Sequence, residues 1–217
     1  MKTRLASLLF LLLLATRPLW AVIGIDQTVS GDRSNSSSTA STPIFSTRSG
    51  NELLLAFIST DAKKSGMMVN SVSGGGLTWT LVARTNVQLG TAEIWRAFAI
   101  PALSGVSVRA SLSQNVASSI TVVSFTDVDP SGINGSGGIG AIASANSSSG
   151  APTVSLVTTR ANSWVFAVGT DWDRAVSRTP GPNQILVHQF MPRVGDTYWV
   201  QRQSDPTPPR RNASDHK

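Results

Sequence analysis

From residue 22 onward the chain places apolar and polar residues in short runs that Gly, Ser, Asn, Asp or Pro separate. Alternation with a period of two is typical of a strand with one buried face, and helical periodicity is absent. Residues 106–113 alternate apolar and polar side chains and predict a half-buried strand. Residues 53–58 and 164–168 are apolar at successive positions, which predicts central strands covered on both faces.

Roughly a dozen candidate strands follow one another at close spacing, and no segment has the pattern of a crossover helix. The pattern therefore predicts an all-β fold, an antiparallel two-sheet β-sandwich of jelly-roll type. The other expected strands are residues 23–29, 44–47, 67–72, 77–84, 93–100, 119–126, 153–158, 185–190 and 196–203.

Three polar segments interrupt or follow these strands. Residues 34–42 are almost all Ser and Thr and are expected to form a mobile loop. Residues 132–150 mix Gly, Ser, Ala and Asn, and 139–145 within them could form a flat, Gly-rich strand. After residue 203 the chain is rich in proline, which cannot donate to a strand ladder, so residues 204–217 are expected to be a disordered tail.

The first 21 residues have the pattern of a signal peptide. Lys2 and Arg4 supply a positive start, residues 5–16 are largely apolar, and Ala21 is a small residue suitable for cleavage. The apolar run is too short for a transmembrane helix, which needs about 20 residues. We therefore expect residues 22–203 to form one exported domain, secreted or at the cell surface, with no membrane span in the mature chain.

Composition narrows the class further. The chain has no cysteine, so no disulfide and no thiolate chemistry is expected, and its two glutamates and four lysines disfavour a helical bundle. The net charge of +6 lies mostly at the two ends of the chain. Without the leader, 15 basic residues stand against 12 acidic ones, and without the tail from Pro208 onward 12 stand against 11. The expected domain is nearly neutral, which disfavours a nucleic-acid function.

The sequence Asp171-Trp172-Asp173 follows an expected strand and carries the main candidate site. Carboxylates at a loop can bind a hard cation such as calcium or accept hydrogen bonds from sugar hydroxyls, and an indole can stack on a sugar ring. The alternative is that Trp172 caps the core and the aspartates shape a turn with Arg174. No other cofactor is expected.

Most of the tryptophans are expected to fill the core. Tyr198 and Trp199 are adjacent on a strand, so their side chains face opposite ways and one of them should be exposed beside Trp172. The expected ligand-binding residues are therefore Asp171, Trp172, Asp173 and Tyr198.

Glu93 allows an alternative function. With Asp171 it could form the acid and nucleophile pair of a glycoside hydrolase, which needs two carboxyl groups at a defined separation. The competing interpretation is an ion pair of Glu93 with Arg84 or Arg96, which is ordinary for a strand residue.

The remaining polar candidates give weaker patterns. Asp127 and Asp129 precede Pro130 and favour a turn, since the spacing lacks the glycine and distal glutamate of a calcium loop. His188 is the sole histidine of residues 22–203 and is expected in the core or at an interface. No serine lies in the Gly-x-Ser-x-Gly context of a hydrolase nucleophile.

Four stretches carry a resemblance to a known family: residues 72–86 (VSGGGLTWTLVARTN), 90–95 (GTAEIW), 120–127 (ITVVSFTD) and 163–173 (SWVFAVGTDWD). They resemble an uncharacterised family of exported β-sandwich domains in environmental bacteria that has no assigned activity. The resemblance covers about residues 26–203 and implies the fold more than a function. It also implies a further apolar strand at the end. This chain has an Arg-Arg tail there, which a truncation or a shifted reading frame would explain.

Together these patterns favour an exported, non-catalytic β-sandwich module that binds an extracellular partner, with polysaccharide as the first expectation and a surface protein as the second. A glycan hydrolase that uses Glu93 and Asp171 is one alternative. A structural module of surface or matrix proteins without a ligand is the other.

Overall fold

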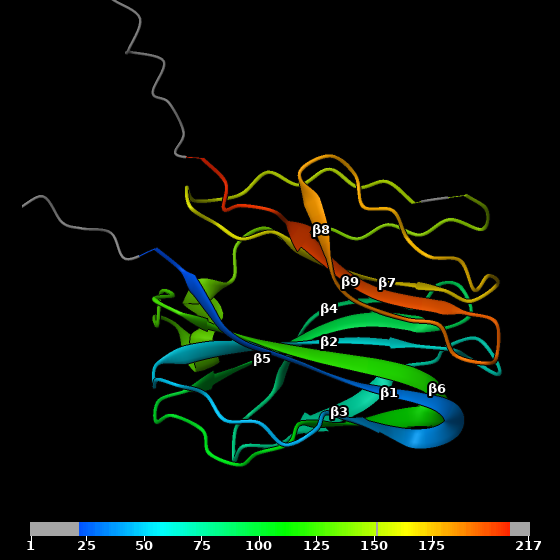
Figure 1. Ribbon diagram of the computed structural model, residues 1–217, viewed down its shortest axis with the longest axis horizontal. Coiled ribbons are helices and arrows are strands. Elements are labelled where there is room, and N and C mark those ends of the chain that lie inside the picture. Colours follow the sequence, from blue (N-terminus) through cyan, green and yellow to red (C-terminus); the bar gives the residue numbers. More distant parts are fainter. Residues whose placement is uncertain (1–21, 151, 209–217) are drawn as a thin grey trace, which may run out of the picture.

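A computed structural model describes residues 22–150 and 152–208. It is nearly all β and contains two antiparallel sheets, as the sequence predicts (Figure 1). In the described part of the chain the elements are β1 (Gly24–Ser41), β2 (Glu52–Thr60), β3 (Val69–Ser73), β4 (Thr80–Thr85), β5 (Thr91–Ala99), β6 (Arg109–Thr126), a short 3₁₀ helix (Ile133–Gly138), β7 (Phe166–Asp171), β8 (Gln184–Phe190) and β9 (Thr197–Gln203).

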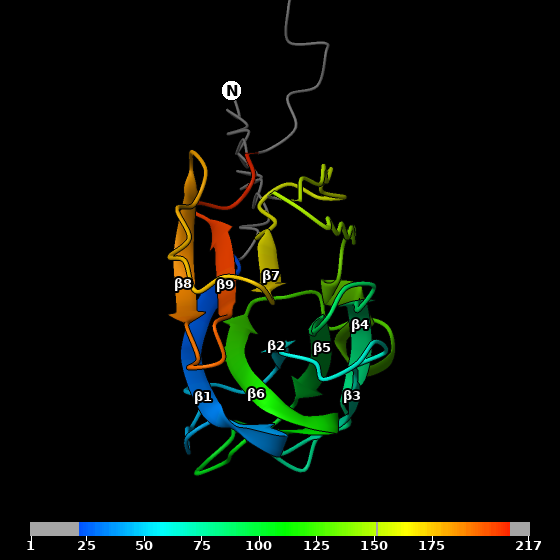
Figure 2. The ribbon, with the colours of Figure 1, turned by 90° about the vertical axis from the view of Figure 1, so that its right-hand side faces the viewer.

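The first sheet has the order β1-β6-β2-β5-β4, and β3 pairs with the beginning of β6. Because β6 is long and curved, its first half pairs with β3 and the end of β1, whereas its second half pairs with β2 and the start of β1. The sheet therefore curls back on itself. The second sheet, β7-β9-β8, packs against the outside of the curl (Figure 2).

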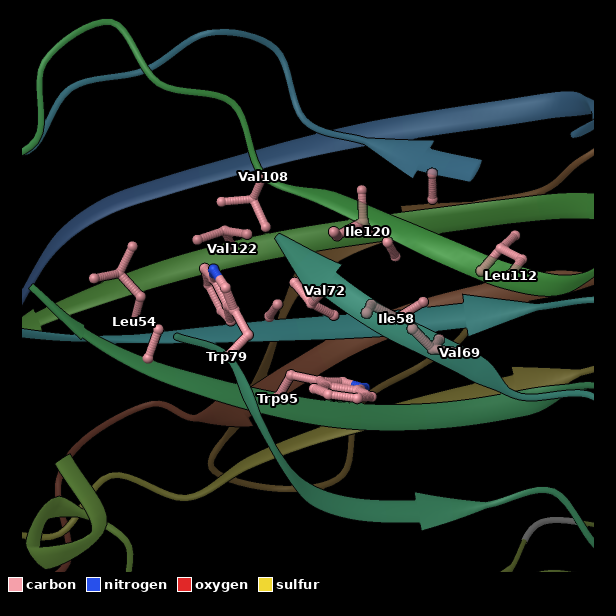
Figure 3. Close-up of a cluster of buried hydrophobic side chains, with 14 of the residues drawn as sticks. Leu54, Ile58, Val69, Val72, Trp79, Trp95, Val108, Leu112, Ile120 and Val122 are labelled. Carbon is pink, nitrogen blue, oxygen red and sulfur yellow. The ribbon is translucent and has the colours of Figure 1, made fainter. Parts of the chain in front are cut away.

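Strand β2 is buried on both faces, as the apolar run 53–58 predicts. Leu54 and Ile58 point into the inner core, inside the curled sheet (Figure 3). Leu53 and Phe57 point the other way, into the intersheet core between the two sheets. The inner core includes Leu54, Ile58, Val69, Val72, Trp79, Trp95, Ile120 and Val122, and the intersheet core includes Leu53, Phe57, Val123, Phe125 and Val200.

Phe166 of β7 ties the second sheet to the first. Its ring stacks on Phe57, with centroids 5.4 Å apart, and meets Phe125 edge to face at 5.3 Å. Both geometries are favourable for aromatic quadrupoles. The Ser59 hydroxyl adds a hydrogen bond to the Gly169 carbonyl at 3.0 Å. The two sheets are thus joined by apolar packing and by direct polar contacts.

The expected mobile loop at residues 34–42 is wrong. Residues up to Ser41 belong to β1, which follows the bend of β6 through register shifts at Arg33–Ser37 and Ser37–Thr39. Serine and threonine satisfy the backbone at these irregular positions: the Ser37 hydroxyl donates to the Thr39 carbonyl at 2.9 Å. A polar composition is therefore compatible with a strand that buries only part of its surface.

Other expectations also change. The strand expected at residues 44–47 is absent from the assigned strands, and Phe45 forms only an isolated bridge with Val106. Residues 139–145 and 153–158 lie outside the assigned strands. The central strand expected at 164–168 differs as well: β7 begins at Phe166 and is covered on one face only, so Ala167 is exposed. The start of the expected tail is held by backbone hydrogen bonds: the amide of Thr207 donates to Ser163 at 2.9 Å. Residues 209–217 and the expected signal peptide at 1–21 lie outside the described residues.

In the described part of the chain, no helix has the length and apolar character needed to cross a membrane.

Gly31→Ala is expected to lower the free energy of unfolding by about 2 kcal/mol. The bend of β1 brings Gly31 against its own later part, and an added Cβ would lie 2.0 Å from the Ser41 carbonyl oxygen. Urea unfolding measures the change. Ser36→Ala, at an exposed position of the same strand, should shift stability by less than about 0.5 kcal/mol. Equal stabilities of the two variants would contradict this account of the bend.

Candidate functional site

Asp171 ends β7 and begins the candidate site. Its carboxylate forms an ion pair with the Arg178 guanidinium, and Asp171 Oδ1 accepts a hydrogen bond from the Asp173 amide at 3.2 Å. This is the turn that the sequence allowed as an alternative, with Arg178 in the place expected for Arg174. Asp171 is therefore used to shape residues 172–180, which we call the β7 end loop.

The second sheet holds the β7 end loop in place. The Thr197 hydroxyl of β9 donates to the Arg174 carbonyl at 2.7 Å, and it accepts a hydrogen bond from the Val176 amide at 2.9 Å. The Arg178 amide donates to Gln189 Oε1 of β8 at 2.7 Å. The loop therefore lies on the outer face of β8 and β9 and has fixed contacts with both strands.

Trp199 lies on that outer face below the loop. The Arg178 guanidinium lies 4.8 Å from the centroid of the Trp199 ring, within the range of a cation–π contact. The ring covers Gly169, where an added Cβ would lie 2.2 Å from an indole carbon. Only glycine leaves room for the indole there. Trp199 is thus the outward-facing member of the pair that it forms with Tyr198.

Trp172 is half-buried and makes no hydrogen bond and no ring contact with another described residue. The other described tryptophans all make one. The indole N–H is donated to Gly74 by Trp79, to Glu93 by Trp95 and to Ile23 by Trp164. The Arg178 guanidinium lies over the ring of Trp199. The exposed Asp173 carboxylate beside it also has no partner among the described residues. Trp172 and Asp173 are therefore the predicted site residues that stay available for a ligand.

Tyr198 is wrong as a surface ligand residue, because its side chain is fully buried. Its hydroxyl donates to Asp196 Oδ2 at 2.7 Å and lies 3.3 Å from the Ala117 carbonyl oxygen. Burial raises the pKa of Tyr198 above its ordinary value. Burial also raises the pKa of Asp196 to about 6, and the charges of Asp61 and Asp171 add to the effect. The pair is a buried polar link between β9 and β6.

Glu93 is fully buried in the inner core and serves as a structural hub. Its carboxylate lies 2.8 Å from Arg84 Nε, accepts the Val69 amide at 2.8 Å, and accepts the Trp95 indole N–H at 2.9 Å. The ion pair with Arg84 is one that the sequence predicts. Asp171 lies on the second sheet, beyond the intersheet core, so the structure does not bring the two carboxylates of the hydrolase hypothesis together.

His188 and Asp129 have structural contacts. His188 Nε2 lies 3.0 Å from both carboxylate oxygens of Asp32, which places the histidine at an interface between β8 and β1, as expected. Asp129 accepts the Ser131 amide at 2.9 Å and pairs with Arg160. Hydrogen bonding by the Ser131 side chain, and then by Arg160 and the Ser131 amide, lowers the pKa of Asp129 to about 2. The two contacts of Asp129 agree with the turn expected before Pro130.

The described residues contain no group of three or more histidine, aspartate or glutamate side chains that could hold a metal ion.

A cavity of about 180 Å³ between the sheets was missed by the sequence analysis. Its walls come from both sheets, where Leu55, Ile94 and Phe166 contribute, and from residues 138–143, 156, 158 and 159. Every lining residue is uncharged. The sequence indicates it only indirectly, because residues 139–145 and 153–158 are expected as strands and yet lie outside the assigned strands.

A scan of protein-family models and searches of curated proteins and of solved structures return no match for this chain. The resemblance to an exported domain family therefore stays a prediction.

The buried carboxyl of Asp196 is expected to make the protein less stable as the pH rises through about 4 to 6. The folded-state pKa of about 6 lies above the ordinary 3.8, so the folded state binds more protons in this window and stability falls as the proton leaves. The loss is at most about 3 kcal/mol at neutral pH. The measurement is urea unfolding of the wild type and Asp196→Asn at pH 4 and pH 7.

The difference between the two proteins isolates Asp196 from the other carboxyl groups. Asp196→Asn keeps an oxygen that can accept from Tyr198 but removes the titration, so the wild type should lose stability relative to this variant between the two pH values. A constant difference would show that the Asp196 carboxyl titrates normally.

Glu93→Gln is expected to lower the free energy of unfolding by about 3 kcal/mol, because it leaves the half-buried Arg84 guanidinium beside a neutral group. Glu52→Gln is the matched control. Glu52 is also fully buried, but only one of its oxygens has a hydrogen-bond partner, so this variant should lose less stability. A stable Glu93→Gln protein that has lost glycan hydrolysis would instead support a catalytic role.

Proposed function

We propose that this protein is an exported, non-catalytic module that binds an extracellular polysaccharide through the β7 end loop. Trp172 is the stacking surface, and Asp173 accepts hydrogen bonds from sugar hydroxyls. Asp171 and Arg178 act as positioning residues that hold the loop and do not contact the sugar.

The state of Trp172 is the observation that carries the proposal. A tryptophan side chain that completes a core is buried and finds a partner for its N–H. Trp172 is half-buried and makes no hydrogen bond or ring contact with a described residue, although it sits on a loop that Thr197 and Gln189 fix. An indole that is held at the surface without a structural contact fits a sugar ring, whose C–H face packs on the indole face.

The rigidity of the loop supports the same function. Binding costs conformational entropy when a loop must be ordered by its ligand. Here the ion pair of Asp171 with Arg178 and the contact of Arg178 with Trp199 order the loop in the free protein. The exposed carboxylate of Asp173 then stands next to Trp172 without a competing cation among the described residues.

Export and the finer fold class belong to the same proposal. Residues 1–21 have the pattern of a signal peptide, and the resemblance to exported domains points to the cell exterior. A β-sandwich of the jelly-roll type would place the β7 end loop at one end of two packed sheets, where loops of such folds carry binding residues. The strong burial of β2, and not a disulfide, would provide stability outside the cell.

Trp172→Ala is expected to weaken polysaccharide binding at least about tenfold while the fold is kept, because the stacking surface is lost and no structural contact is. The measurement is native affinity electrophoresis of the protein in gels with xylan, laminarin, pectin or soluble cellulose derivatives. The matched control is Val176→Ala, at an exposed position of the same loop, which should be retarded like the wild type.

Two outcomes contradict the proposal. If the wild type is retarded by none of the polysaccharides, the ligand class is wrong, and a structural module gains support. If a folded Trp172→Ala protein is retarded as strongly as the wild type, binding lies elsewhere on the molecule. Thermal melts of each variant establish that the fold is kept.

A further inference from the structure

β7 is an edge strand with an open side. Among the described residues it pairs with β9 alone, and in Figure 2 it is the strand of its sheet nearest β4 and β5. The Val165 carbonyl accepts the Gln203 amide at 3.0 Å, so alternate residues from Val165 onward face β9. By the alternation of an antiparallel ladder, the N–H and C=O groups of Phe166 and Val168 point to the open side.

The beginning of β7, at Phe166, and the residues just before it line the apolar cavity between the sheets. Phe166 is in its wall, together with Leu55 and Ile94 of the first sheet. The opposite wall of the cavity consists of residues 138–143, 156, 158 and 159, several of which are glycine or alanine. Small residues leave room for another backbone. The cavity of about 180 Å³ is slightly larger than an apolar cavity of about 150 Å³ that accepts benzene, so it has space for one or two aliphatic side chains.

The segments on the far wall have the same open backbone. No described residue makes a backbone–backbone hydrogen bond to residues 140–150 or 152–157. They have no assigned strand or helix and carry exposed apolar side chains, with Ile142 54%, Val154 52% and Val157 73% exposed. Unpaired backbone groups thus occur on both sides of an apolar space, which is the environment of a missing central strand.

We propose that this slot, formed by the open edge of β7, the cavity and the segments opposite, binds an extended segment of a partner polypeptide as an added β-strand. The partner strand is uncharged and carries aliphatic side chains at alternate positions. Its backbone continues the β8-β9-β7 ladder at Phe166 and Val168, and its inward side chains fill the cavity.

The chemistry of the slot selects this occupant. No charged residue lines it, so a charged strand would lose hydration without gaining a partner. A lipid chain or another small apolar ligand could fill the cavity but would leave the ladder groups of Phe166 and Val168 without partners. Residues 209–217 carry two arginines, a lysine and four further polar or charged residues, which make them unsuitable as the occupant.

The test uses an acetylated and amidated peptide, Thr-Val-Thr-Val-Thr-Val-Thr, added at about 1 mM to the isotopically labelled protein. Hydrogen exchange followed by NMR should show the amides of Phe166 and Val168 exchanging at least about tenfold more slowly with the peptide present. A peptide with lysine in place of each valine has the same backbone and should give no protection.

Two pairs of variants locate the site. Val168→Pro removes the outward N–H at an edge where proline is tolerated, and Val168→Ala removes the same packing but keeps the N–H. Only the proline variant should lose the peptide. Ala141→Phe fills the slot from the far wall, whereas Ala167→Phe adds the same ring to the outer face of β7. Only Ala141→Phe should abolish protection, and this pair does not depend on the fold of a proline variant.

Three results would overturn the proposal. No protection by the valine peptide at this concentration means that the slot does not accept a strand. Equal protection by the lysine peptide means that the cavity does not select the occupant. Protection that rises with protein concentration in the absence of peptide would place a second copy of this chain in the slot.

Discussion

The structure depends on one constraint, namely that β2 must be covered on both faces. Six successive apolar residues, 53–58, cannot keep one face in water, because burying each aliphatic or aromatic side chain contributes about 1.5 to 3 kcal/mol. One face is covered when the first sheet curls so that β3 and Trp79 close over it. The other face needs a second layer. The β7-β9-β8 sheet exists as a layer because Phe166 and Val200 cover Leu53 and Phe57.

This arrangement also fixes where polar chemistry can lie. The two cores contain most of the large side chains. A glutamate inside the curl can be buried only when a cation balances its charge, and Arg84 balances the charge of Glu93. Asp196 is buried without such a cation, and the hydroxyl of Tyr198 is its partner. Among the described strands, the outer face of the second sheet has no further sheet packed on it, and the β7 end loop lies there. A loop that is held there, with an indole that is not used for packing, is consequently where a ligand could bind without disturbing a core.

The sequence predicts the parts of this structure that depend on local pattern. Alternation identifies the strands, and the run 53–58 identifies the strand covered on both faces. The features that the sequence does not predict depend on the neighbouring strand of the same sheet. Residues 34–41 form part of β1 because β6 bends beside them, which their own composition does not encode. Alternation shows that Tyr198 and Trp199 face opposite ways, but which of them is inside depends on the register between β9 and β8.

The candidate site is predictable to the same extent. Asp171-Trp172-Asp173 marks the loop, but the use of Asp171 as a partner of Arg178 needs the path of the next seven residues. Residues 139–145 and 153–158 are expected to be strands, the first as a flat, Gly-rich strand and the second as an apolar one. They form no ladder because a strand needs a neighbour at about 4.8 Å, and none of the described residues provides it. A pattern that predicts strands and a structure that leaves them unpaired are consistent if the sheet is completed by a strand from outside the described chain.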